Sequence, residues 1–155
     1  MLKIYQRCDM QISSRFTIAV HVLICIGTFR NDYKITSDFL ASSVNVNPVV
    51  IRRIIQQLKK AGIITVKRGS GGADIARPLD EITLLDVYNA VECIGNGALF
   101  HFHENPSSVC PVGRNIHAVL DRRLDAIQKA MEREMQSVTL RDIMDDTSRL
   151  LDVDS

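Results

Sequence analysis

The side chains best suited to a chemical task lie together in one basic segment, residues 48–77. This segment holds seven Lys and Arg residues against a single acid, Asp74. Because the whole chain carries only +1, the segment carries +6 and the remainder carries −5. A basic patch on an otherwise acidic chain indicates a face that meets a polyanion, although a solvated helix face can have the same composition.

The kinds of side chain in this segment favour nucleic acid as the polyanion. Arg and Gln can each form paired hydrogen bonds with a base edge, Arg with guanine and Gln with adenine. Lys suits phosphates, which add affinity without sequence information. We expect DNA contacts from Asn47, Val49, Arg52, Arg53, Gln56 and Gln57 in the major groove, from Lys59 and Lys60 on phosphates, from Lys67 and Arg68 on a hairpin, and from Arg15 at the start of the first helix.

A helix from Pro48 to about Ala61 must position most of these side chains. Asn47 is a good N-cap, Pro48 suits the first helical position because its missing N–H costs nothing there, and Gly62 can end the helix. Apolar residues recur on one face of the helix, which leaves the opposite face for ligand contacts. This apolar face consists of Ile51, Ile54, Ile55 and Leu58.

The segments before this helix complete a DNA-reading unit. A first helix is expected from Ser13 or Ser14 to about Phe29, where Gly27 and Asn31-Asp32 break it, and a short second helix from Thr36 or Ser37. A turn at 45–47 separates this second helix from the basic one. A short helix, a tight turn and a second amphipathic helix form a helix-turn-helix, whose second helix enters the major groove in DNA-binding proteins.

A hairpin is expected directly after the basic helix. Residues 63–67 form a strand in this interpretation, 68–72 a tight glycine-rich turn and 74–76 the returning strand. Lys67 and Arg68 at its tip can reach phosphates or the minor groove, as the wing of a winged helix does. A nucleotide-binding interpretation of the glycines is not favoured, because no Gly-Lys-Ser/Thr sequence is present.

The C-terminal part is expected to be helical and to pair with a second copy. Thr83 can cap a helix that runs to about Cys93, residues 94–111 form an irregular loop, and a long helix follows over 112–136. A last short helix starts at Thr139, with Asp142 placed for a capping box. The long helix, roughly 37 Å in length, projects beyond a small domain and carries one apolar seam for a partner helix. The seam consists of Ile116, Leu120, Leu124, Ile127, Met131 and Met135.

Two stretches resemble a known family of bacterial regulators. Residues 58–92, LKKAGIITVKRGSGGADIARPLDEITLLDVYNAVE, and the opening QISSRFTIAVHVL resemble the Rrf2 family of winged-helix repressors, the family of IscR, NsrR and CymR. The YwnA-like subgroup is the most similar, through ITLLDVYNAVE and LFHFHENPSSVCPVGRNIHAVLD. The resemblance covers about 10–148. It departs at Ala73 and Asp74, where the family usually has a large apolar residue. It implies a homodimeric repressor that binds a palindromic operator.

The cysteines bear on how such a regulator would sense a signal. Several family members hold an iron–sulfur cluster on three cysteines, starting near the end of the fourth helix. Cys93 and Cys110 fall near the first and last of these positions, but Ala98 or Leu99 stands at the second. Two thiolates are too few, so no cofactor is expected. The segment's histidines, His101, His103 and His117, match no zinc spacing.

We therefore expect redox sensing, if present, at Cys93 and Cys110. Cys110 precedes Pro111 at the start of the long helix, where a helix N-terminus favours the thiolate. A buried, inert thiol is the simpler interpretation of most free cysteines.

The fold class expected is mainly α with a small β wing. Residues 1–9 are interpreted as an extension, 10–80 as the winged helix-turn-helix domain, and 81–150 as an effector loop with a helical dimerisation region. No apolar run approaches the ~18–20 residues of a membrane span, and no signal peptide is recognisable, so a cytoplasmic location is expected.

Two other functions are weighed against a non-enzymatic DNA-binding regulator. A winged-helix adaptor for another protein would show little salt-dependent DNA binding, and the basic face argues against it. A thiol enzyme would need Cys110 and His103 or His117 in hydrogen-bond reach, beside a pocket.

Overall fold

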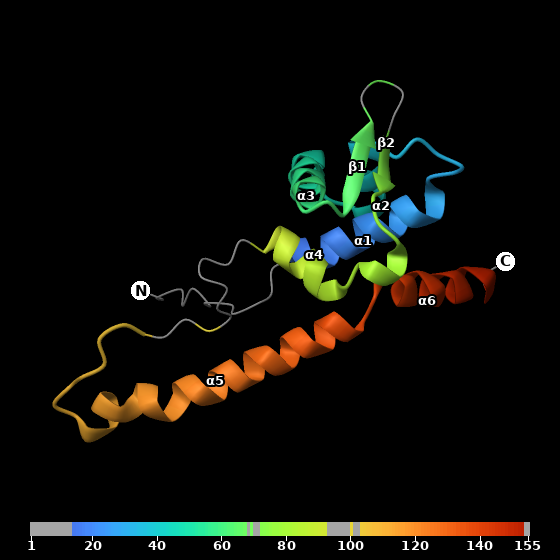
Figure 1. The fold of residues 1–155 in the computed structure, drawn as a ribbon. Helices are drawn as coiled ribbons and strands as arrows, with labels where there is room; N and C mark the ends of the chain where they lie inside the picture. Colours follow the sequence, from blue (N-terminus) through green and yellow to red (C-terminus); the bar gives the residue numbers. More distant parts are fainter. Residues whose placement is uncertain (1–13, 68, 70–71, 93–99, 101–102, 154–155) are drawn as a thin grey trace.

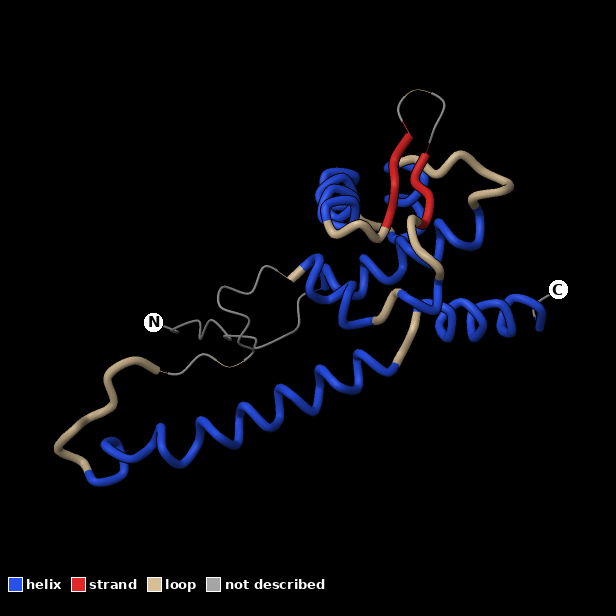
Figure 2. The backbone as a smooth tube through the Cα atoms, viewed as in Figure 1, coloured by secondary structure: helices blue, strands red, loops and turns tan. Residues whose placement is uncertain are grey.

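The protein consists of a helical head, which carries a two-stranded hairpin, and a long helix that leaves this head (Figures 1 and 2). The structure is a computed structural model, and it describes residues 14–67, 69, 72–92, 100 and 103–153. Its elements are α1 (Ser14–Phe29), α2 (Ser37–Val44), α3 (Pro48–Lys60), β1 (Ile64–Lys67), β2 (Gly72–Ile75), the 3₁₀ turn η1 (Leu79–Glu81), α4 (Leu84–Val91), α5 (Pro111–Ser137) and α6 (Leu140–Val153). The expected class, mainly α with a β wing, is confirmed.

The core of the head forms around α1. This helix contacts α2, α3, β2, α4 and α6, and its side chains Val22, Leu23 and Ile26 are fully buried. Burial of one such aliphatic side chain contributes about 1.5–3 kcal/mol. Aliphatic side chains of the surrounding elements complete the same core, namely Leu40, Ile51, Ile54, Leu58, Ile63, Ile64, Ile82, Val87, Val91 and Leu140.

The helix-turn-helix is closed by side-chain caps. The Thr36 hydroxyl accepts a hydrogen bond from the Phe39 N–H at 3.1 Å and starts α2. Asn45, in the left-handed conformation (φ 58°), ends α2. The Asn47 side chain then accepts from the Val49 N–H at 2.8 Å and starts α3, with Pro48 in the first turn. The expected caps Thr36 and Asn47 are confirmed, and the turn between the two helices is fixed by local chemistry.

The hairpin is antiparallel and is fastened to the loop before α2. Ile64 pairs with Ile75, and Lys67 pairs with Gly72. The second strand thus begins earlier than the sequence indicated. Near the turn of the hairpin, Ala73 is buried and donates its N–H to the Ile35 carbonyl at 3.2 Å. A side chain on Gly72 would place its Cβ 3.0 Å from the Ile35 backbone, so this close approach requires glycine.

The junction of α4, α5 and α6 is built on two capping boxes. The Thr83 hydroxyl accepts from the Asp86 N–H and the Thr83 N–H donates to Asp86. The pair Thr139 and Asp142 repeats this arrangement, as the sequence predicted. The two box regions are joined by an antiparallel bridge, with the Leu140 N–H donating to the Ile82 carbonyl at 2.7 Å. The start of α6 is therefore fixed on the start of α4.

The end of the first helix at about Phe29 is confirmed, whereas two other expectations, a short last helix and a break at Gly27, were wrong. The last helix spans 14 residues and is not short, because Leu140 and Met144 pack against the core. The first helix continues through Gly27 to Phe29. A Cβ at Gly27 would lie 2.8 Å from the Met144 methyl carbon. Gly27 therefore lets α6 approach α1 closely and does not break the helix.

Replacement of Gly72 by Ala is expected to destabilise the head more than the same change at Gly62. Both glycines have positive φ, which costs an L-residue about 1–2 kcal/mol. The Cβ at Gly62 meets nothing within 4 Å, whereas the one at Gly72 meets the Ile35 backbone. Urea unfolding of Gly62→Ala, Gly72→Ala and the unchanged protein would measure both losses. Equal losses would show that the contact with Ile35 has no energetic weight.

Candidate nucleic-acid interface

One face of α3 is buried and the opposite face is open to solvent. Ile51, Ile54 and Leu58 are fully buried and hold the helix against the core. The side chains expected to contact DNA lie mostly on the other face. Val49 is 65% exposed, and Arg52, Arg53, Gln56, Lys59 and Lys60 are all exposed. The cap residue Asn47 is exposed as well, and its carbonyl oxygen is engaged with the Val49 N–H.

Arg52 has an acidic neighbour on α2. Its Nη2 lies 3.8 Å from Oδ1 of Asp38, with both side chains largely exposed. An ion pair of this kind contributes at most about 1 kcal/mol, so a phosphate or a guanine edge can take the place of the carboxylate. Asp38 therefore holds Arg52 near the open face without blocking it. This pair could not be predicted from the sequence, because an acid in the first turn of a helix is common for reasons of helix stability.

Gln57 is not on the open face. Its side-chain amide donates to the Val91 carbonyl at the end of α4 at 3.4 Å, and the residue is half-buried. At 100° per residue Gln57 lies at the edge of the buried face of α3, and α4 packs against this helix. The expectation that Gln57 faces outward with Gln56 is therefore corrected. A sequence pattern can place a residue beside the buried face but cannot show which neighbouring helix covers it.

Arg15 is also engaged within the head. Its Nη2 lies 3.9 Å from Oε2 of Glu92, whose side chain is 8% exposed. This pair joins the start of α1 to the residue that follows α4. The sequence had suggested a phosphate contact for Arg15, and that contact stays a prediction.

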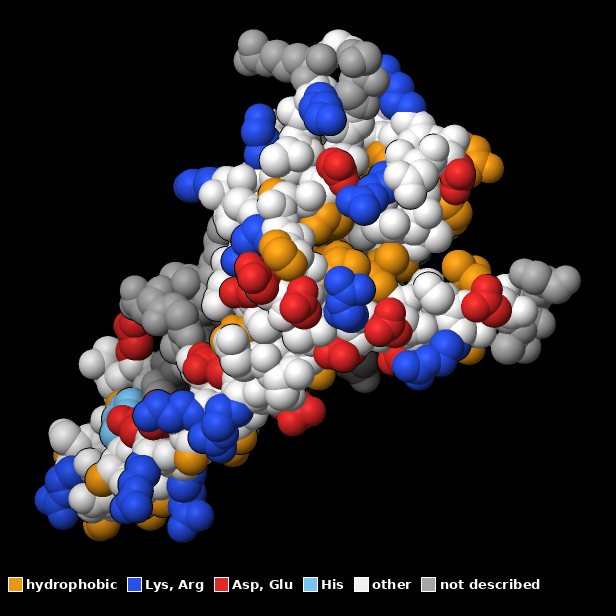
Figure 3. All heavy atoms as spheres, turned by 45° about the vertical axis from the view of Figure 1, so that its right-hand side comes forward, with side chains coloured by type: hydrophobic (Ala, Val, Ile, Leu, Met, Phe, Trp, Pro, Cys, Tyr) orange, Lys and Arg blue, Asp and Glu red, His pale blue; other side chains and the backbone are white. Residues whose placement is uncertain are grey.

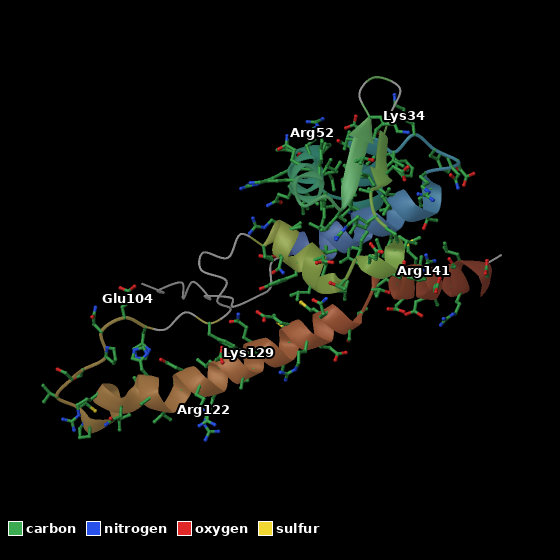
Figure 4. The ribbon with its side chains drawn as sticks, viewed as in Figure 1. Lys34, Arg52, Glu104, Arg122, Lys129 and Arg141 are labelled. Atoms are coloured by element: carbon green, nitrogen blue, oxygen red, sulfur yellow. The ribbon has the colours of Figure 1, made fainter. Side chains whose placement is uncertain are left out.

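The wing stands beside α3. Lys67, the last residue of β1, is exposed, whereas Arg68 lies outside the described residues. A further lysine, Lys34, approaches the wing from the loop between α1 and α2 and donates its Nζ to the Gly69 carbonyl at 3.3 Å. Figure 4 shows Arg52 and Lys34 on either side of the wing. Sequence reasoning missed Lys34, because it lies outside the basic segment and only two residues after Asp32.

Charge is divided between the two ends of the head. In Figure 3, Lys and Arg side chains surround the end that carries α3 and the wing. Acidic side chains gather lower on this face of the head. Among the acids of the head, Asp80 and Glu81 belong to η1, and Asp142, Asp145 and Asp146 belong to α6. The electrostatic field of the head therefore favours a polyanion at the wing end.

The long helix α5 leaves the head with its apolar seam only partly covered. None of its side chains is buried, and Ile127 in the seam is 54% exposed. The other seam residues, Ile116, Leu120, Leu124, Met131 and Met135, are half-buried. The helix contacts α4 near its own C-terminal end, where burial and the negative charges of Glu92 and Glu132 raise the pKa of Tyr88.

The segment expected to sense a signal is described in part. Cys93 and His101 lie outside the described residues. Cys110 is exposed at the N-cap of α5, and the backbone N–H groups of Gly113 and Val112 lower the pKa of its thiol. The rings of His103 and His117 stack with centroids 6.5 Å apart, and Nδ1 of His117 lies 3.2 Å from Oδ1 of Asp121.

The donor set does not fit an iron–sulfur cluster. Between the end of α4 and the start of α5 the chain offers only Cys93 and Cys110, and such clusters generally take four protein ligands. In the described residues, no three His, Cys, Asp or Glu side chains converge in a way that could hold a metal ion. Within that same part of the chain, no helix combines the length and apolar character needed to cross a membrane.

The capped helix pair, the exposed α3 and the adjoining hairpin define a winged helix-turn-helix protein. Comparisons with known proteins identify its family. The Rrf2 family, described as "Iron-dependent Transcriptional regulator", matches residues 12–146. The chain therefore belongs to the Rrf2 family of transcriptional regulators, as the resemblance indicated.

Individual relatives agree with this assignment. YwnA of Bacillus subtilis (strain 168), by name a candidate HTH-type transcriptional regulator, is 44% identical over 86% of this chain and 96% of its own length. A crystal structure of a candidate DNA-binding protein is 40% identical, covers 84% of this chain and 99% of its own, and has a TM-score of 0.67. T. potens IscR shares the fold at 20% identity, with 88% of each chain covered and a TM-score of 0.66.

Membership in this family also bears on the alternatives. The family and its named relatives are transcription regulators and not enzymes, so the thiol-enzyme interpretation of Cys110 is set aside. The family description mentions iron, whereas the two cysteines of this chain are too few for the usual cluster.

Alkylation of Cys110 is expected to remain fast at a lower pH than alkylation of an ordinary cysteine. A lowered pKa leaves a larger thiolate fraction at a given pH, and the thiolate is the nucleophile. Peptide mass spectrometry after brief iodoacetamide treatment across a pH series would follow the reaction, with buried Cys25 as the slow internal reference. In urea the pH midpoint for Cys110 should rise, since the backbone N–H groups are no longer aligned. An identical midpoint in folded and unfolded protein would contradict this expectation.

Proposed function

We propose that this regulator binds a palindromic DNA operator as a homodimer and represses transcription from it in the cytoplasm. The observation that carries the proposal is the open face of α3. There Arg52, Arg53 and Gln56 are exposed on a helix whose other face is fully buried. Arg and Gln are the side chains that read guanine and adenine edges in the major groove. A rigidly held helix lets them act at fixed spacing.

The remaining contacts fall into two groups. Asn47 and Val49 at the start of α3 lie where recognition helices meet base edges. Lys59 and Lys60 at its end, and Lys67 with Arg68 on the wing, supply charge for the two DNA backbones. In this proposal Gln57 does not contact DNA, because its side-chain amide donates to the Val91 carbonyl of α4. Arg15 is also proposed to contact a phosphate, which would compete with the Glu92 carboxylate for the Arg15 guanidinium.

The proposed dimer is formed through α5. A helix of 27 residues is about 40 Å long, and its apolar seam is left partly exposed along its whole length. A second copy of the helix would cover the seam. Two-fold symmetry then places the two α3 helices on half-sites about one helical turn of DNA apart.

A redox signal is proposed to act at Cys110, for which exposure and the lowered pKa provide support; Cys93 is the partner thiol that the sequence offers. No cofactor is included in the proposal. Replacement of Cys110 by Ser should leave DNA binding intact and remove only its response to oxidants.

Selection from random duplex DNA is expected to recover a palindrome with half-sites about one turn apart. The affinity should fall steeply as salt rises, because bound phosphates release counterions. Arg53→Ala should lose about 1–3 kcal/mol on the selected sequence and relax the preference at one base pair. Arg141→Ala, which removes the same type of side chain from α6 (Figure 4), is the matched control. Failure to enrich any sequence with reduced or oxidised protein would instead favour the protein-interaction adaptor.

Leu124→Glu is expected to convert the dimer to a monomer, because it places a charge in the α5 seam. Ala118→Glu puts the same charge outside the seam, about 120° around the same helix from Leu124, and should leave the dimer intact. Sedimentation velocity would report the assembly of both variants. The monomer should also bind a full palindrome far more weakly, since the two half-sites are no longer linked. A dimer that survives Leu124→Glu would place the interface elsewhere.

A further inference from the structure

A hollow of about 180 Å³ lies where the start of α2, α3 and the wing meet. Its apolar lining comes from Ile35, Ile55 and Val66, and its cations are Lys34 and Lys67. Thr36, Ser37 and the wing glycines provide the rest of its polar lining. A water molecule takes about 30 Å³ of liquid volume, so the hollow has room for several polar atoms of a ligand.

We propose that this hollow receives a backbone phosphate of DNA, between Lys34 and Lys67 on the wing side of α3. This inference rests on the proposed DNA binding and adds a site to it. The two lysines come from different parts of the chain, the α1–α2 loop and the end of β1, and both line the same hollow. Lysine is a compact charge with several donors, which suits a phosphate better than a base edge.

Local charge favours an anion in this hollow. Among the described residues, no Asp or Glu lines it. Two acids on the neighbouring elements have partners of their own: Asp38 lies 3.8 Å from Arg52, and Asp74 lies 2.9 Å from Arg30. Asp32, on the same loop as Lys34, is not among the described lining residues. Lys34 gives one hydrogen bond to the Gly69 carbonyl at 3.3 Å. An ammonium group has three donors, so two remain for phosphate oxygens.

The hollow is also held in place by the backbone. The Ala73 N–H donates to the Ile35 carbonyl at 3.2 Å, directly beside Lys34. Gly72 approaches the same Ile35 backbone closely. The loop that carries Lys34 and the wing that carries Lys67 therefore form one frame, and a phosphate between them would fix the wing on the DNA backbone.

The test is the salt dependence of DNA binding by Lys34→Gln, measured on the selected operator and on a random duplex. Loss of one phosphate contact should reduce the slope of log K against log salt by about 0.9. The affinity loss should then be about three to four times larger at 50 mM than at 200 mM salt. It should be similar on both DNAs, since a phosphate carries no sequence information. Lys34→Arg should retain most of the slope.

Lys129→Gln, a change of the same kind on α5 far from the wing (Figure 4), is the matched control and should not alter the slope. Because glutamine can still donate to the Gly69 carbonyl, Lys34→Gln should keep the wing in place, and an unchanged melting temperature would verify that. An unaltered slope in Lys34→Gln, or a loss confined to the operator, would overturn the phosphate site while the proposed function stands. Absence of DNA binding by the unchanged protein would overturn both.

Discussion

The burial of one face of α3 is the constraint on which the rest of the head depends. Ile51, Ile54 and Leu58 have no exposed surface, so the rotation of α3 about its own axis is fixed by the core. Because that rotation is fixed, the opposite face is fixed as well, and its polar side chains need no partner within the protein. The Asn47 cap and the left-handed Asn45 set where the helix begins. The face proposed to contact DNA thus results from apolar packing on the other side.

The same core connects α3 to the parts of the chain that follow the wing. Gln57 donates to the last turn of α4, and α4 begins on a capping box that is bridged to the start of α6. The long α5 ends at that same bridge. The relative placement of α3 and α5 is therefore set through α4 by a short series of hydrogen bonds and buried aliphatic contacts. Among the described residues, these contacts join α3 to the proposed dimer helix α5 through α4 and the start of α6.

Helix starts and the buried face of α3 could be predicted from the sequence. Which distant element packs over a given residue could not. Asn47, Thr83 and Asp142 indicate helix starts because capping acts over three residues. The buried face of α3 follows from the helical spacing of its apolar residues. Gln57 was misplaced because its surroundings are decided by α4, which is distant in sequence. Lys34 could not be predicted as part of the basic face for a similar reason, since only the fold brings it to Gly69. The sequence predicts Gly27 to break the first helix. In the structure the close approach of Met144 explains why glycine stands at this position.

The fastening of the hairpin to Ile35 has a consequence for protein engineering. A two-stranded hairpin alone is marginal in water, and here β2 gains its support from the Ile35 carbonyl and from a glycine that admits that backbone. The wing is therefore not a portable module by itself. An exchange of wings between two regulators of this family would have to move the loop before α2 together with the hairpin, as a single unit made of two separate stretches of chain.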